Sequence, residues 1–195
     1  MDYLISICMG IGLSACCGFR IFVPLLASAL ASKFGVIDTP AGFDWMNSWT
    51  AISIFGTATI FEIGAYYIPY LDHLLDTITT PLSMVAGTVL ASSFFTDIFS
   101  DLPALQWVMG AIVGGGGAGM VQAGTSLARV GSTATTGGLG NPIVSTIENG
   151  FSIFFSALSI VIPFIVAFVF VLGFGFIGWF LIKKFSNKTP KIQLE

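Results

Sequence analysis

The segment from residue 151 to residue 182 is almost wholly apolar, with Pro163 near its middle. A helix that crosses a bilayer needs about 20 consecutive apolar residues. Residues 142–182 drawn as one straight helix would be about 60 Å long, which is twice the thickness of a bilayer core. We therefore expect a half-helix followed by a full span, with the break near residues 159–163.

The rest of the chain has the same character. Of its 195 residues, 55% are hydrophobic and only 9% are charged, whereas a soluble domain carries about 25% charged residues. Such a chain needs the bilayer as its solvent, because a soluble core could not absorb this much apolar surface. The sequence therefore predicts an all-α integral membrane protein with about five or six transmembrane helices.

The charges and cysteines exclude some classes of function. The net charge is −3 and no basic patch is present, so we expect no nucleic-acid partner. Cys8, Cys16 and Cys17 all lie in the first apolar run and are interpreted as small buried hydrophobes. No cofactor is predicted.

The first predicted span, residues 4–31, has an arginine in its middle. Gly10, Ser14 and Gly18 recur every four residues and give the helix one small face, against which another helix can pack closely. Arg20 follows, and Pro24 is expected to bend the helix there. We expect Arg20 to pair with a carboxylate of the stretch 62–81, although a contact with an anion or a substrate is also open.

The stretch 62–81, EIGAYYIPYLDHLLDTITTP, concentrates polar groups between apolar runs. A charge at the centre of a bilayer costs at least about 2.5–3.5 kcal/mol, so these groups need partners, water or a function. Glu62 is predicted to lie inside a span, four residues before Tyr66 on the same helix face. Thr80 is expected to cap a new helix that begins at Pro81, after a broken or re-entrant segment near residues 69–81.

A second break is predicted over residues 131–142, GSTATTGGLGNP, which contains no charge and is rich in glycine. Asn141 and Pro142 repeat the cap-and-proline pattern of residues 80–81. The preceding span, residues 104–128, has glycines every seven residues. These faces suit close helix packing, either within the chain or in a homo-oligomer.

Three motifs stand out together: GLSACCGFRIFVPLL (12–26), YYIPYLDHLLDTITTP (66–81) and GSTATTGGLGNP (131–142). In combination they resemble those of a family of small bacterial membrane proteins, domain-of-unknown-function family 4126. The resemblance implies a bacterial multi-span protein and no particular activity.

The leading functional hypothesis is a transporter or channel for a small ion or polar solute, possibly coupled to protons or cations. Carboxylates without a partner in a membrane hold a proton or a cation, and discontinuous helices are common in secondary transporters. The stretch 62–81 is expected to form one wall of a central polar site and the stretch 131–142 the other. The candidate ion- or substrate-binding residues are Arg20, Glu62, Tyr66, Asp72, His73, Asp76, Arg129, Thr136, Gly137, Gly138, Asn141 and Glu148.

Two alternatives remain at this point. One is a membrane-embedded protein that handles lipids, either a flippase or scramblase or an enzyme acting on a lipid phosphate. If a metal is bound, Asp72 and Asp76 would hold it, but no catalytic residue is assigned, because motifs such as HExxH and GxSxG are missing from the sequence. The other alternative is a non-catalytic scaffold. We expect one membrane domain over residues 1–182 in a bacterial inner membrane, and a lysine-containing cytoplasmic tail over residues 183–195.

Overall fold

A computed structural model describes residues 3–39, 42–68 and 71–186, and every regular element in these ranges is helical. In chain order they are α1 (Tyr3–Cys16), α2 (Phe22–Lys33), the 3₁₀ turn η1 (Asp44–Asn47), α3 (Trp49–Ala65), α4 (Leu71–Phe95), α5 (Pro103–Met109), the π-helical segment η2 (Gly110–Gly115), α6 (Gly116–Thr136), α7 (Asn141–Val161) and α8 (Pro163–Ser186). The prediction of an all-α integral membrane protein is confirmed.

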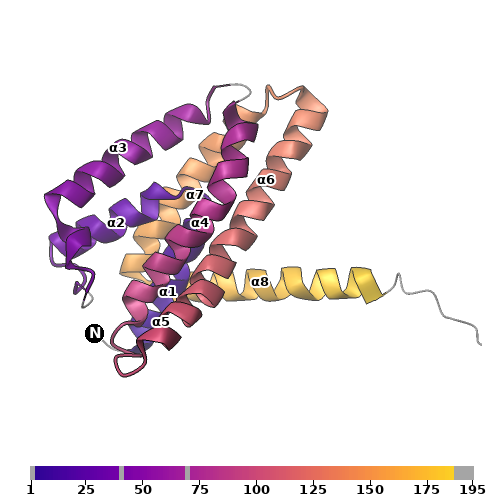
Figure 1. The fold of residues 1–195 in the computed structure, drawn as a ribbon. Coiled ribbons are helices and arrows are strands. Elements are labelled where there is room, and N and C mark those ends of the chain that lie inside the picture. Colours follow the sequence, from indigo (N-terminus) through magenta and orange to yellow (C-terminus); the bar gives the residue numbers. More distant parts are fainter. Residues whose placement is uncertain (1–2, 40–41, 69–70, 187–195) are drawn as a thin grey trace, which may run out of the picture.

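Figure 1 shows α1, α4, α6 and α7 side by side in a bundle, with the pair α2 and α3 leaning off one side and α8 leaving the bundle at its lower end. Within the described residues, four helical segments are long and apolar enough to cross a membrane: Leu74–Phe95, Pro103–Thr136, Asn141–Val161 and Pro163–Lys184. The shorter helices α1, α2 and α3 are also apolar. The side on which the C-terminus lies, the boundaries of the domain and the bacterial inner membrane remain predictions, and residues 187–195 of the tail lie outside the described part.

Glycines bring α4 and η2 together. A Cβ atom on Gly114 would lie 2.2 Å from the carbonyl oxygen of Gly87, and one on Gly110 would lie 2.0 Å from the hydroxyl of Ser92. Gly114 therefore accepts no side chain without moving a helix, and at Gly110 the Ser92 hydroxyl would have to move. This confirms close packing through the glycine-rich span within the chain, while contacts between copies remain a prediction.

The first predicted span is two helices, and the break lies at Arg20 and not at Pro24. Helix α1 ends at Cys16, and α2 begins at Phe22 with Pro24 in its first turn, where a proline is tolerated. A Cβ on Gly18 would lie 2.3 Å from the carbonyl oxygen of Ala118, so α6 passes directly against the break.

The predicted helix start at Pro81 is wrong. Helix α4 runs from Leu71 to Phe95 with Pro81 inside it. The Thr80 hydroxyl does not cap a helix but donates to the carbonyl oxygen of Asp76, 2.7 Å away. Membrane helices tolerate internal prolines because the surrounding structure satisfies the freed backbone groups.

The predicted break at 131–142 is shorter than expected. Helix α6 continues to Thr136 and ends in a turn whose Gly137 and Gly138 have φ of 64° and 89°, which glycine adopts without strain. Helix α7 begins at Asn141 with Gly140 before it, so Asn141 is its first residue and not its cap. The break between α7 and α8 falls at Ile162, as predicted, but α7 has 21 residues and is a full span, so the predicted half-helix is wrong.

Candidate functional site

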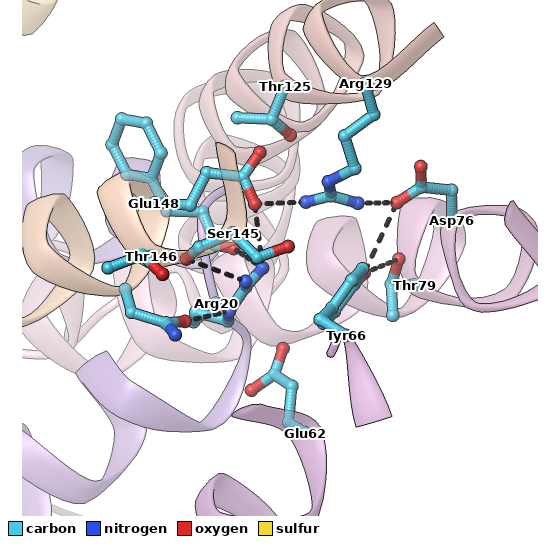
Figure 2. A network of polar contacts seen from close by, with 12 residues as sticks. Arg20, Glu62, Tyr66, Asp76, Thr79, Thr125, Arg129, Ser145, Thr146 and Glu148 are labelled. Atoms are coloured by element: carbon cyan, nitrogen blue, oxygen red, sulfur yellow. Dashed lines mark hydrogen bonds and ion pairs between the residues drawn. The ribbon is translucent and has the colours of Figure 1, made fainter. Parts of the chain in front are cut away.

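A buried network of polar side chains lies where the α1–α2 break meets α4, α6 and α7 (Figure 2). Its centre consists of two arginines and two carboxylates, which we call the charged cluster: Arg20, Asp76, Arg129 and Glu148. Both arginine side chains have 0% exposure, the Glu148 side chain has 5% and the Asp76 side chain has 12%. The cluster is therefore shut off from the surface except at Asp76.

Glu148 joins the two arginines. Its Oε2 atom accepts from Nη1 of Arg20 at 3.0 Å and also from Nη2 of Arg129. The other terminal nitrogen of Arg129 donates to Asp76. One carboxylate thus holds two cations that would otherwise repel each other in a medium of low dielectric constant.

Arg20 is held by protein oxygens on every nitrogen. Its Nε donates to Oδ1 of Asn149 at 2.5 Å, and Nη1 also donates to the carbonyl oxygen of Phe19 at 2.9 Å. Its Nη2 donates to the carbonyl oxygen of Ser145 at 3.3 Å. This arrangement favours the structural interpretation of Arg20 over a direct contact with an anion.

The Tyr66 ring lies against both arginines. The guanidinium carbon of Arg20 is 4.1 Å from the ring centroid and that of Arg129 is 4.2 Å, so both make cation–π contacts. The Tyr66 hydroxyl lies 3.3 Å from Asp76 Oδ1 and 3.1 Å from the hydroxyl of Thr79. Tyr66 therefore ties the end of α3 to α4 and fixes the spacing of the two guanidinium groups.

Glu62 lies at the edge of the network and caps α2. Its two carboxylate oxygens accept from the backbone N–H groups of Ile21 at 2.7 Å and Phe22 at 3.1 Å. These are donors that a helix N-terminus leaves unsatisfied, and a negative charge is favourable there. The start of α2 is therefore capped by a side chain that comes from α3.

The predicted site residues divide into three groups. Five come together as expected: Arg20, Tyr66, Asp76, Arg129 and Glu148, with Glu62 beside them. The second group does not reach the cluster, because seven residues of helix, about 10 Å, separate Arg129 from the α6–α7 turn. Thr136 and Gly137 are exposed in that turn, Gly138 is half-buried, and Asn141 is buried but donates to Thr133 Oγ1 at 3.0 Å.

The third group, the side chains of Asp72 and His73, lies outside the described residues, so the predicted metal ligation by Asp72 and Asp76 stays a prediction. Within the described residues, no group of three or more His, Cys, Asp and Glu side chains is arranged to hold a metal ion. The second wall of the site is formed by Arg129 and Glu148 and not by the glycine-rich turn.

The prediction of which carboxylate pairs with Arg20 is also wrong. Arg20 pairs with Glu148, which lies 128 positions away, and not with a carboxylate of the stretch 62–81. Sequence reasoning missed Asn149, Ser145, Thr79 and Gln122, whose amide donates to Thr79 Oγ1 at 3.1 Å. A signal for Ser145 was available, because it precedes Glu148 by three residues and so shares its helix face.

An apolar groove of about 580 Å³ opens between α6, α7 and α8 beside the charged cluster. Its walls include Phe155, Phe170 and Phe174, and Glu148 and Thr125 are among its lining residues. An apolar groove of this kind accommodates a hydrocarbon chain. In this protein, Glu148 places one carboxylate beside it.

A family model described as a domain of unknown function (DUF4126) matches residues 7–184 of the chain, which is nearly its whole length and includes every residue of the charged cluster. No curated protein and no solved structure matches the chain.

Proposed function

We propose that this chain, which belongs to the DUF4126 family, is a transporter or channel for a small ion or polar solute, with the charged cluster as its translocation site. The observation that carries the proposal is the Arg20–Glu148–Arg129–Asp76 network, buried among helices long and apolar enough to cross a membrane. Ionisable residues inside a membrane are costly, and they mark ion and substrate pathways or proton relays.

The charge balance supports an ion as the translocated species. Two arginines face Asp76, Glu148 and the nearby Glu62, which leaves one carboxylate in excess if all are ionised. Oxygen Oε1 of Glu148 is buried and has no hydrogen-bond partner. A buried carboxylate oxygen without a partner is expected to hold a proton or a cation.

The discontinuity between α1 and α2 also supports this function. Secondary transporters place helix ends at their binding sites, where the free backbone groups contact ions and substrates. Here the start of α2 reaches the network and is capped by Glu62.

Charge movement in liposomes tests the proposal. Purified protein is reconstituted, and currents are recorded on a supported membrane under separate gradients of H⁺, Na⁺, K⁺ and Cl⁻. We expect the wild-type protein to give currents, the Glu148→Gln variant to lose them and the Asp76→Asn variant to reduce them. The matched control is Asp101→Asn, which changes an exposed carboxylate outside the network and is expected to keep the wild-type currents. A wild-type protein that moves none of these ions, or a Glu148→Gln variant with full currents, contradicts the proposal.

The apolar groove favours a second candidate, a lipid-handling protein such as a scramblase. Because a Cβ on Gly124 or Gly173 meets no atom within 4 Å, the substitution Gly124→Phe is expected to fill the groove without disturbing the helices. A scramblase would equilibrate a fluorescent phospholipid between leaflets, and this variant would slow it. Equal rates in empty and protein-containing vesicles would exclude this candidate, and a scaffold would give neither ion currents nor lipid movement.

A further inference from the structure

A line of polar side chains continues from the charged cluster along α7. We call it the polar file, and it consists of Ser145, Glu148, Ser152, Ser156 and Ser159. The intervals of three, four, four and three residues place all five on one face of the helix. None is more than 3% exposed. From residue 145 to residue 159 the file covers 14 helical steps, about 21 Å along the helix axis.

Part of the file lacks hydrogen-bond partners. The hydroxyls of Ser145 and Ser152 and the Oε1 atom of Glu148 are buried and make no hydrogen bond. Buried polar groups in proteins are almost always paired, often by ordered water where the site is polar. Unpaired groups on both sides of the same carboxylate therefore point to water or a proton along this face.

The file lies in the interface between α7 and α1. A Cβ on Gly12 would lie 2.5 Å from Oγ of Ser159, so Ser159 packs directly against the backbone of α1. The Cys16 thiol lies beside Ser156 and Ser159. Small residues of α1 thus cover these hydroxyls and shield them from lipid.

Each end of the file approaches the surface. At one end, Tyr67 is exposed, and its hydroxyl lies 2.9 Å from that of Thr146 and 3.3 Å from the amide nitrogen of Asn149. At the other end, a pocket of about 470 Å³ at the corner between α7 and α8 is lined by Ile160, next to Ser159, and by the exposed Asp38.

We propose that the polar file is a proton pathway, which makes the proton the ion moved by the transporter proposed above and so rests on that function. Glu148 accepts a proton at Oε1 and releases it to a hydroxyl or water of the file. Because successive hydroxyls are about 5–6 Å apart, a water molecule between them takes the proton on its oxygen and releases one of its own to the next hydroxyl, so one proton is transferred and no group is changed.

The chemistry of the file favours a proton over a metal cation. Metal cations such as Ca²⁺ require six to eight oxygen ligands at once, whereas the file offers one carboxylate and single hydroxyls about 5–6 Å apart. A proton needs only hydroxyls and water molecules that both donate and accept hydrogen bonds.

Proton uptake into liposomes tests this inference with the full chain. A potassium gradient with valinomycin drives uptake, and a trapped pH-sensitive dye records it. The double variant Ser152→Ala/Ser156→Ala removes two hydroxyls of the file. The matched control, Ser83→Ala/Ser93→Ala, removes two buried hydroxyls on α4 that donate to the carbonyl oxygens of Thr80 at 2.9 Å and Leu90 at 2.7 Å.

The file variant is expected to slow proton uptake about tenfold, because a moving charge loses one strong hydrogen-bond partner, and the control is expected to match the wild type. If the double variant elutes as an aggregate in size-exclusion chromatography, Ser156→Ala alone is measured, and a rate below that of the control still supports the file.

An unchanged rate in the folded file variant overturns the pathway and leaves the transport proposal intact if Glu148→Gln still abolishes currents. Wild-type currents carried by Na⁺, K⁺ or Cl⁻ without proton uptake overturn the pathway alone. A wild-type protein that moves no ion overturns both proposals.

Discussion

Replacing both members of the Arg129–Glu148 pair should cost much less stability than the sum of the two single replacements. Glu148→Gln leaves two guanidinium groups without their shared carboxylate. Arg129→Met leaves Asp76 and one arm of Glu148 without their cation. The double variant removes both members of the pair, so neither is left facing an absent partner, while Arg20 and Asp76 each still lose one contact.

The size of each effect follows from burial. Removing one member of a buried ion pair destabilises a protein by about 3–5 kcal/mol, and both side chains here are at most 5% exposed. Independent effects would therefore sum to about 6–10 kcal/mol. Since the residues are in direct contact, we expect the double variant to fall short of the sum by about 1–3 kcal/mol.

Unfolding in mixed micelles of mild detergent and SDS, followed by circular dichroism, gives the free energies for the cycle. Asp101→Asn serves as the exposed carboxylate control and is expected to leave the midpoint unchanged. Additivity within about 0.5 kcal/mol would show that the two residues do not stabilise each other, and the description of the charged cluster as one network would then be wrong.

Two further predictions concern the frame around the cluster. Glu62→Ala should destabilise the protein by about 0.5–2 kcal/mol, the usual cost of losing an N-terminal cap. Glu62→Gln should lose less stability, because its amide oxygen still accepts a hydrogen bond from the start of α2. Equal unfolding midpoints for Glu62→Ala and the wild type would argue against the cap. Gly114→Val should cost at least about 1–3 kcal/mol in the same assay, because its Cβ would lie 2.2 Å from the Gly87 carbonyl oxygen. Gly116→Ala, where a Cβ meets nothing within 4 Å, is the control, and equal effects of the two would contradict the close packing of α4 and η2.

The sequence alone was sufficient to predict the class of protein and to single out the charged residues that lie together in the structure. Apolar runs of this length have no other solvent than lipid, and Arg20, Arg129 and Glu148 stand out because charges there need a partner. The break at Ile162 was predictable because Pro163 follows it.

The pairing of the charges was not predictable, because it depends on which helices pack together. Arg20 meets Glu148 only because α1 lies against α7, and no local pattern specifies that contact. Pro81 misled the prediction for a related reason. Pro81 lies inside α4, and whether a membrane helix continues through a proline depends on the surrounding tertiary structure, which a local pattern does not specify.

The structure also assigns different tasks to carboxylates that look alike in the sequence. Glu62 uses both oxygens on the start of α2, and Asp76 is engaged by Arg129 and Tyr66 at the most exposed edge of the cluster. Glu148 alone among the three has one oxygen on the arginines and a second oxygen that is buried without a partner. Protonation at Oε1 would remove the charge that holds both arginines, as Glu148→Gln does, so a proton there would be coupled to the packing of the whole network. The transport proposed above therefore depends on Glu148, whereas Glu62 and Asp76 hold the helices around it.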